Sequence, residues 1–263
     1  MSNTETSMPM PSSAVSSGVA AVDAYLKVGY DTVPGMSSRF AAAVCARLMR
    51  IQTGLGVKGP IAEIGTFEGR FFIALAKALQ PGEIALGMDI FEWPNPQVIE
   101  RFEANCLRHG VAADQRRTWK CDSRTVTPAE LLKQLGGRRP RLFHIDGDHS
   151  RASLEKDLAL ATAVMPDDGL LVLDDMLHPG YPTLMVAVHA HLAAHPELCV
   201  LAIIDRETIV AATKFVICHR DWFKRYEAVM LEEFKANIWP LGADFEPHWC
   251  LVLSLDTRLA AIT

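Results

Sequence analysis

Acidic side chains of a kind that could hold a metal ion follow two short apolar runs of the chain. They are Asp146, Asp148, Asp174 and Asp175. If these carboxylates meet, their repulsion costs several kcal/mol unless a cation or a proton compensates it. Oxygen ligands suit Mg²⁺, Mn²⁺ or Ca²⁺ better than zinc. The pattern therefore predicts a divalent-cation site, and capping of the next helix by Asp174 and Asp175 is the alternative.

A glycine-containing segment, EIGTFEG, begins at Glu63 and stands between a short apolar run and a helical pattern. Gly65 and Gly69 would allow a tight turn and the close approach of a ligand, and the N-terminus of the following helix would offer N–H groups. The spacing E-x-G-x-x-x-G differs from the G-x-G-x-x-G of dinucleotide-binding proteins. The segment therefore indicates a ligand-binding loop, and a plain strand-to-helix turn is the alternative.

Polar residues also end the next two predicted strands. Asp89, before Ile90, ends the second strand, where a carboxylate can accept hydrogen bonds from ribose hydroxyls. Asp122 and Ser123 end the third, where they would meet an adenine amino group. Each of these residues alone would also suit a helix cap. Together, at successive strand ends, they favour a nucleoside site.

These side chains need a framework, and the pattern predicts one in which strands and helices alternate. The expected strands are Pro60–Ile64, Ile84–Ile90, Arg117–Cys121, Leu142–Ile145 and Leu170–Leu173. The expected helices between and after them are Glu68–Leu79, Asn95–His109, Pro128–Leu135, Ser153–Val164 and Pro182–His195. Such alternation predicts an α/β fold with a doubly wound, Rossmann-like, mostly parallel sheet. Ligands bind such sheets beyond the carboxyl ends of the strands.

The rest of the chain predicts additions to this sheet. Cys199–Ile204 and Lys214–Cys218 are joined by a link too short for a helix crossover, so we expect an antiparallel pair at one edge. A long helix, Asp221–Ile238, and a last strand, Trp249–Leu255, complete the pattern. We expect one domain over residues 20–263, with helical additions at both ends and a C-terminal extension from about 219. The Ser/Pro/Met-rich residues 1–19 are expected to be a disordered tail.

Composition excludes several classes of protein. The 263 residues carry a formal net charge of -5, which argues against nucleic acid as a partner. No window offers the ~20 apolar residues of a membrane span, so no membrane association is expected. The six cysteines are scattered, which is typical of reduced thiols in a cytoplasmic protein. Apolar residues along Asp221–Ile238 make a homo-oligomer plausible.

The segments EIGTFEG, GMDIFE, CDS, IDGDHSRASLEKDL and MPDDGLLVLDDM resemble class I S-adenosylmethionine (SAM)-dependent methyltransferases over about residues 30–200. More narrowly, they resemble the metal-dependent O-methyltransferases that act on sugar hydroxyls in antibiotic pathways, typified by macrocin O-methyltransferase. The chain after Cys218 departs from that pattern, so the resemblance does not extend to the acceptor.

The resemblance implies a role for each residue of these segments. SAM and Mg²⁺ (or Mn²⁺) are the expected cofactors. The residues expected beside SAM are Glu63, Gly65, Thr66, Gly69, Asp89, Ile90, Asp122, Ser123 and Asp146. Asp146, Asp174 and Asp175 are expected to hold the metal. The expected proton acceptor is Asp148 or His149, with the resemblance favouring Asp148 and the unperturbed pKa of imidazole favouring His149.

The function predicted from these residues is SAM- and metal-dependent O-methylation of a small hydroxylated metabolite, in natural-product biosynthesis. N-methylation, or a hydroxylase-associated protein of the same fold, is the first alternative. A nucleotide-dependent oxidoreductase is the second, disfavoured by the missing third glycine. A non-catalytic subunit is the third, and it would have no reason to tolerate the repulsion among the acids.

Overall fold

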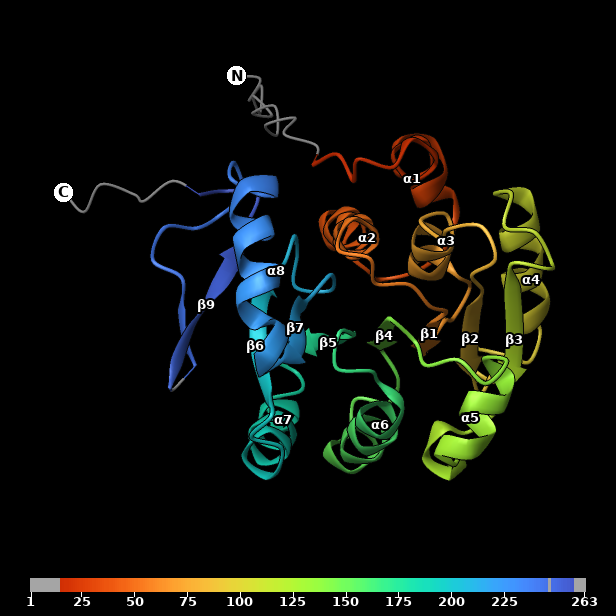
Figure 1. Ribbon diagram of the computed structural model, residues 1–263. Coiled ribbons are helices and arrows are strands. Elements are labelled where there is room, and N and C mark those ends of the chain that lie inside the picture. The colour runs from red at the N-terminus through yellow and green to blue at the C-terminus, as the bar shows by residue number, and fades with distance from the viewer. Residues whose placement is uncertain (1–14, 246, 258–263) are drawn as a thin grey trace, which may run out of the picture.

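The apolar runs form one mixed sheet between two layers of helices, as the computed structural model shows for residues 15–245 and 247–257 (Figure 1). Over these residues the sheet has nine strands in the order β3-β2-β1-β4-β5-β7-β6-β9-β8. The strands are β1 Ile61–Ile64, β2 Ala85–Asp89, β3 Arg116–Lys120, β4 Leu142–Ile145, β5 Leu170–Met176, β6 Leu198–Ile204, β7 Thr213–His219, β8 Ala243–Phe245 and β9 His248–Leu253.

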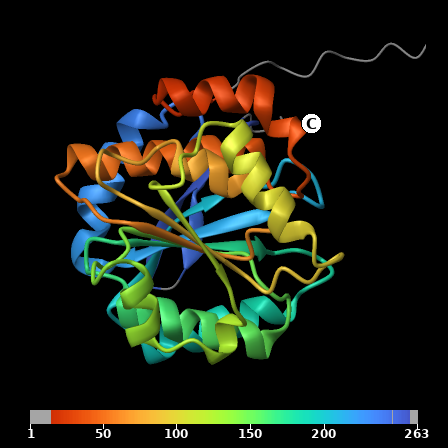
Figure 2. The same cartoon turned by 90° about the vertical axis from the view of Figure 1, so that its right-hand side faces the viewer.

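Helices cover both faces of the sheet, with α2, α3, α4 and α8 on one side and α5, α6 and α7 on the other (Figures 1 and 2). Their bounds are α1 Ala20–Ala24, α2 Arg39–Gly54, α3 Arg70–Ala76, α4 Val98–Arg108, α5 Pro128–Gln134, α6 Arg151–Val164, α7 Thr183–Ala194 and α8 Arg220–Glu233. A π-helical turn at Tyr25–Gly29 and a 3₁₀ turn at Tyr30–Thr32 join α1 to the rest, and a second 3₁₀ turn spans Ser123–Thr125. Within the described residues, no helix is long and apolar enough to cross a membrane.

The doubly wound half of the sheet confirms the predicted fold class. β3, β2, β1, β4 and β5 are parallel neighbours, with β1 pairing β2 on one side and β4 on the other. Chain order reverses at β1, so the carboxyl ends of β1 and β4 border the crevice where ligands bind such sheets. The acids predicted at the strand ends are therefore brought to one edge.

The strand expected to stop before the acid pair continues through it. β5 runs to Met176, so Asp174 and Asp175 stand inside the strand and do not cap a helix. Asp175 has φ +58°, and the pairing of β5 with β7 shifts register between Leu173 and Met176. This irregularity turns two successive carboxylates toward different partners.

The expected antiparallel pair is present as β6 and β7, but it lies inside the sheet. β7 is antiparallel to β5 as well as to β6, and β9 with β8 extends the sheet beyond β6. The strand β8 was not predicted. Because Phe215 pairs with Leu173, the neighbouring Lys214 enters the site beside Asp174.

The terminal segments pack on this framework. Of the predicted tail, residues 1–14 lie outside the described residues, while both Ser16 and Ser17 donate hydrogen bonds to Asp23 in α1. The apolar side chains that suggested an oligomer face inward: Phe223, Tyr226 and Met230 of α8, and Phe234 directly after it, are buried against this chain's own core. They therefore give no argument for an oligomer.

Candidate cofactor and catalytic site

A cavity of about 780 Å³ opens beyond the carboxyl ends of β1, β2, β4 and β5. It brings together almost all of the residues predicted for the site, and the ones that line it are Glu63, Gly65, Thr66, Asp89, Ile90, Asp122, Ser123, Asp146, Asp148, His149, Asp174 and Asp175. Gly69 stands apart from the lining. It begins α3 at φ +92°, and a Cβ there would lie 3.0 Å from the Phe102 ring, so its role is in packing.

The turn after β1 passes directly against the end of β4. Gly65 has φ +84°, and a Cβ on it would lie 1.6 Å from the carbonyl oxygen of Asp146. Only glycine fits this contact. The turn thereby keeps the backbone of EIGTFEG close to the acids of β4.

Asp89 organises the cofactor loops from the end of β2. Its Oδ2 accepts the N–H of Phe67 and its Oδ1 accepts the N–H of Phe91, each at 2.8 Å. Both phenylalanines have φ +48°, a conformation that costs energy for bulky residues. The acid predicted for ribose thus also stabilises two strained turns beside the cavity.

The predicted adenine residues lie beside a buried acid on α6. Asp122 accepts hydrogen bonds from the Arg124 side chain and from its N–H, so it caps the 3₁₀ turn as well as lining the cavity. Asp157 is buried and hydrogen-bonded to Ser123. Burial raises the pKa of Asp157 to about 6, although the Ser123 hydrogen bond opposes the rise.

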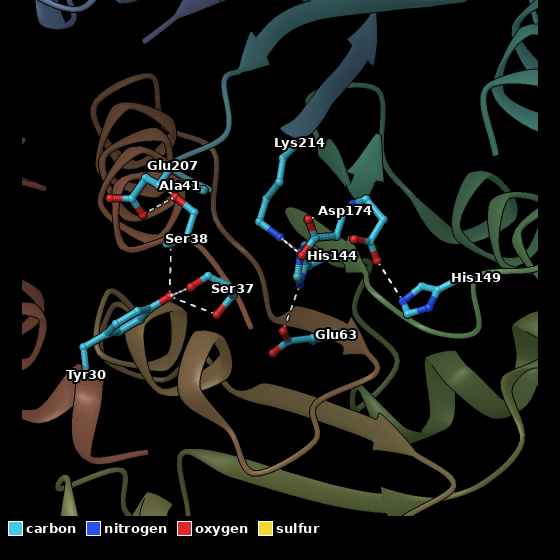
Figure 3. Close-up of polar contacts among 11 residues, drawn as sticks. Tyr30, Ser37, Ser38, Ala41, Glu63, His144, His149, Asp174, Glu207 and Lys214 are labelled. Carbon is cyan, nitrogen blue, oxygen red and sulfur yellow. Dashed lines mark hydrogen bonds and ion pairs between the residues drawn. The ribbon is translucent and has the colours of Figure 1, made fainter. Parts of the chain in front are cut away.

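A second wall of the cavity comes from the segment before α2. The Tyr30 hydroxyl binds the carbonyl oxygens of Ser37 and Ser38, at 3.1 and 2.9 Å (Figure 3). Ser38 caps α2 through the N–H of Ala41, and its hydroxyl donates to Glu207 at 2.7 Å. The loop between β6 and β7 is thereby fastened to the entry segment, of which Pro34, Gly35, Met36 and Ser37 line the cavity.

A buried chain of hydrogen bonds links the end of β1 to the acid pair of β5 (Figure 3). Lys214 Nζ forms an ion pair with Asp174 Oδ2 and lies 3.0 Å from His144 Nε2. Since an ammonium only donates, Nε2 accepts, and Nδ1–H of His144 donates to Glu63 Oε1 at 2.8 Å. Lys214 and His144 are fully buried, and Glu63 nearly so.

Lys214 carries the positive charge of this hydrogen-bond network. Burial alone would lower the pKa of Lys214, but Asp174 and Asp146 outweigh it and raise that pKa. Burial and the Lys214 ammonium hold the pKa of His144 well below its usual range, so the imidazole is neutral. Burial raises the pKa of Glu63 and, together with Asp174, that of Asp146.

Two side chains of this cavity are placed for SAM. Glu63 Oε2 and Thr66 Oγ1 are buried at the cavity without hydrogen-bond partners among the described residues. Orphaned buried polar atoms are costly, and the ammonium and carboxylate of the methionine part of SAM would satisfy them. The donor set therefore fits SAM.

The two predicted proton acceptors have different surroundings. His149 Nε2 lies 2.8 Å from Asp175 Oδ2, and this hydrogen bond raises the pKa of His149. Asp148 Oδ2 accepts the hydroxyls of Ser150 and Ser153, both at 2.7 Å, and they lower its pKa. His149 is therefore the stronger base of the two.

The structure divides the predicted metal ligands between two groups. His144, Asp146 and Asp174 form one group, which we call the inner group, and Asp146, His149 and Asp175 form the outer group. In each group the ligand atoms lie within 4.8 Å of one another. The inner group already contacts the Lys214 ammonium, whereas the outer group presents two carboxylates and an imidazole to the cavity. The outer group fits a divalent ion, and the inner group does not.

Reasoning from the sequence missed His144 and Lys214. Each is a polar residue inside an otherwise apolar strand, LFHI in β4 and TKFVICH in β7. A lysine in a buried strand requires a charged partner, so Lys214 in its apolar strand could have been recognised as part of a buried ion pair. Tyr181, in the loop after the acid pair, stacks on two imidazoles: its ring centroid lies 4.2 Å from that of His149 and 4.5 Å from that of His178.

Residues 62–176 match a family model described as a methyltransferase domain. No curated protein matches the chain by sequence. Among solved structures, the chain is similar to an O-methyltransferase from Bacillus cereus in complex with SAH, at TM-score 0.55 and 15% identity over 76% of this chain and 90% of that one. It is also similar to TomG, an O-methyltransferase from Streptomyces achromogenes in complex with SAM, at TM-score 0.53 and 18% identity over 76% and 89%. NovP, an O-methyltransferase, is similar at TM-score 0.55 and 15% identity over 70% and 80%.

These structural likenesses establish the fold, and the family model covers the strands that carry the EIGTFEG turn, Asp89, Asp146 and the acid pair. The methyltransferase domain and the fold together support a SAM-dependent methyltransferase of class I. The methyltransferase domain spans residues 62–176.

Proposed function

We propose that this protein is an O-methyltransferase that transfers a methyl group from SAM to a hydroxyl of a small metabolite, with His149 as the base. The observation that carries the proposal is the position of His149, which lines the same cavity as the cofactor residues and is held by Asp175. Three of the similar solved structures, the Bacillus cereus enzyme, TomG and NovP, are O-methyltransferases, which supports an oxygen acceptor.

The chain's residues align the acceptor and remove its proton. SAM supplies an electrophilic methyl group on a sulfonium, so the protein's main task is to hold the acceptor oxygen in line with it. Because Nε2–H of His149 donates to Asp175, Nδ1 carries the lone pair that takes the hydroxyl proton. The stacked Tyr181 ring fixes the plane of the imidazole.

The proposal includes a divalent ion, which Asp146 and Asp175 would hold, with His149 beside them. Such an ion, when bound, orients the acceptor oxygens and lowers the pKa of the attacking hydroxyl. Of the three predicted ligands, Asp174 differs, because Oδ1 accepts the N–H of Asp175 at 2.8 Å and Oδ2 pairs with Lys214. Mg²⁺ or Mn²⁺ suits the two carboxylates.

The acceptor class follows from the cavity and from one similar protein. CalS11, described as a TDP-rhamnose 3'-O-methyltransferase of calicheamicin biosynthesis, is similar at TM-score 0.50 and 17% identity over 67% of this chain and 77% of that one. Beyond the acids, Met36, Tyr181 and Val210 line the cavity, so we expect an acceptor with both hydroxyl and apolar parts, in natural-product biosynthesis. We place the protein in the cytoplasm, where its six free thiols remain reduced.

The test is methyl transfer from radiolabelled SAM to pairs of acceptors in which one member has a hydroxyl where the other has an amine. Calorimetry measures the binding of SAM and of NAD separately. We expect saturable SAM binding and label on the hydroxyl member of a pair. Label on the amine member alone would replace O-methylation by N-methylation. Binding of NAD without binding of SAM would contradict the proposal.

A further inference from the structure

Lys214 brings a full positive charge to a place where the sequence predicted a metal ion. Its side chain is fully buried, and it enters the acid cluster from β7. Nζ pairs with Asp174, lies 3.0 Å from His144 Nε2 and stands 4.5 Å from the centroid of the Phe71 ring. A buried ammonium is stable only where charged and polar partners surround it in this way.

The ammonium occupies the inner group, not the outer one. It contacts two of the three inner residues directly, Asp174 and His144, and Asp146 stabilises its charge as well. A divalent ion bound to these same atoms would lie close to Nζ in a medium of low dielectric constant, where like charges repel strongly. The only other acid of the pair, Asp175, is turned away toward His149.

We propose that Lys214 is the resident cation of the inner group and excludes a divalent ion from it, so that Asp174 is a lysine partner and not a metal ligand. A divalent ion is then held by Asp146 and Asp175 of the outer group. Only this last statement rests on the metal dependence of the proposed function. The role of Lys214 itself rests on its burial and its contacts.

The same ammonium acts as a positioning group for the cofactor end of the cavity. By donating to His144 Nε2 it leaves the proton on Nδ1, which donates to Glu63 Oε1. Glu63 Oε2 then remains at the cavity as the oxygen that no described residue contacts by a hydrogen bond. Lys214 therefore links the acid of β5 to the acid of β1.

The test measures Mn²⁺ binding to the whole chain in the absence of SAM. Calorimetry and electron paramagnetic resonance report the number of bound ions and their affinity. Lys214→Met removes the ammonium and should create one additional Mn²⁺ site, because the Asp174 carboxylate and the His144 imidazole are freed beside Asp146. Lys214→Met combined with Asp174→Asn removes both charges of the ion pair. We expect this charge-matched double variant to bind Mn²⁺ as the wild type does, within about threefold in affinity. Asp175→Asn should weaken Mn²⁺ binding by at least about tenfold.

Two outcomes would overturn the proposal: Lys214→Met gains no ion, or the double variant loses the Mn²⁺ that the wild type binds. If the wild type binds no Mn²⁺ and Lys214→Met does, the role of Lys214 stands and the metal dependence of the proposed function fails. Anomalous diffraction from wild-type crystals soaked in Mn²⁺ decides the matter if Lys214→Met does not fold. A peak within about 2.5 Å of an Asp174 carboxylate oxygen overturns the proposal. A peak only at Asp146 and Asp175, or none, supports it.

Discussion

The carboxylates of Asp174 and Asp175 are neighbours in the chain, yet they serve opposite sides of the site. Asp174 pairs with the buried Lys214, and Asp175 accepts a hydrogen bond from His149 at 2.8 Å. The positive φ of Asp175 separates the two side chains. One acid therefore belongs to the buried framework, and the other holds the imidazole that we propose as the base.

Removing the His149 imidazole should lower kcat by roughly 10²- to 10⁴-fold, because the acceptor hydroxyl loses its base. SAM affinity should remain within about threefold of wild type, since the ring is proposed to act on the acceptor. His149→Ala is compared with Asp148→Asn, which we expect to be mild because two serine hydroxyls already occupy the Asp148 carboxylate. Single-turnover kinetics with the best acceptor measures both. A large loss of kcat in Asp148→Asn with a mild His149→Ala would assign the base to Asp148.

Asp89→Asn should weaken SAM binding by about 1–3 kcal/mol, the scale of hydrogen bonds to a charged group. The asparagine amide nitrogen cannot accept a hydrogen bond, so either Phe67 or Phe91 loses the partner of its N–H. Calorimetry of SAM binding measures the effect. Glu92→Gln, three positions beyond the strand end and paired with Lys120 at the surface, is the matched control. Equal SAM affinity in wild type and Asp89→Asn would remove Asp89 from the cofactor site.

Asp157 should make the protein less stable as the pH rises from about 4 to about 6. The pKa of Asp157 is raised to about 6 in the fold, so the folded state binds more protons than the unfolded state in this window. The loss of stability begins above the pKa of the unfolded state, near pH 4, where only the unfolded protein ionises this carboxyl. It reaches its full size once the pH exceeds the folded pKa of about 6. Asp157→Asn should therefore raise the free energy of unfolding at pH 7 by up to about 3 kcal/mol, with the gain vanishing near pH 4. Urea unfolding at several pH values, without SAM, measures this difference. A constant difference across that range would contradict the raised pKa.

Breaking the buried ion pair at the opposite end of the sheet should affect stability and spare the site. Arg141 Nη2 lies 2.7 Å from Glu83 Oε2, and both side chains are almost fully buried. Glu83→Gln leaves the guanidinium charge without its partner, which costs about 3–5 kcal/mol. Thermal unfolding measures the loss, and SAM affinity at low temperature should be unchanged. An unfolding temperature equal to that of the wild type would show that the guanidinium has found other compensation.

The parallel half of the fold was predictable because each strand and helix there has its own periodic pattern. The residues that line the cavity were predictable for the same reason, since they follow those strands directly. The partners that compensate the acids were not, because contacts such as Lys214 with Asp174 join segments distant in the chain. A single lysine in an apolar strand indicates burial, but the identity of its partner depends on where β7 enters the sheet.

The apolar face of α8 was expected to be exposed, and in the structure it is buried. The sequence pattern shows that this face is apolar, but it does not show which part of the chain the face packs against. Phe223, Tyr226, Met230 and Phe234 fill the gap between α8 and the sheet. An apolar helix face thus indicates burial, and tertiary structure decides whether the same chain provides the cover.

The insertion of β7 between β5 and β6 also determines the order in which the site can be completed. A growing chain has all of β1 to β5, and with them every acid of the cluster, before β7 is synthesised. Until then one edge of β5 has unpaired backbone N–H and C=O groups, and Asp174 lacks its ammonium partner. The arrival of one strand pairs the edge and neutralises the charge in the same step. Completion of the acid cluster is thereby coupled to closure of the sheet, and in a growing chain both require β7.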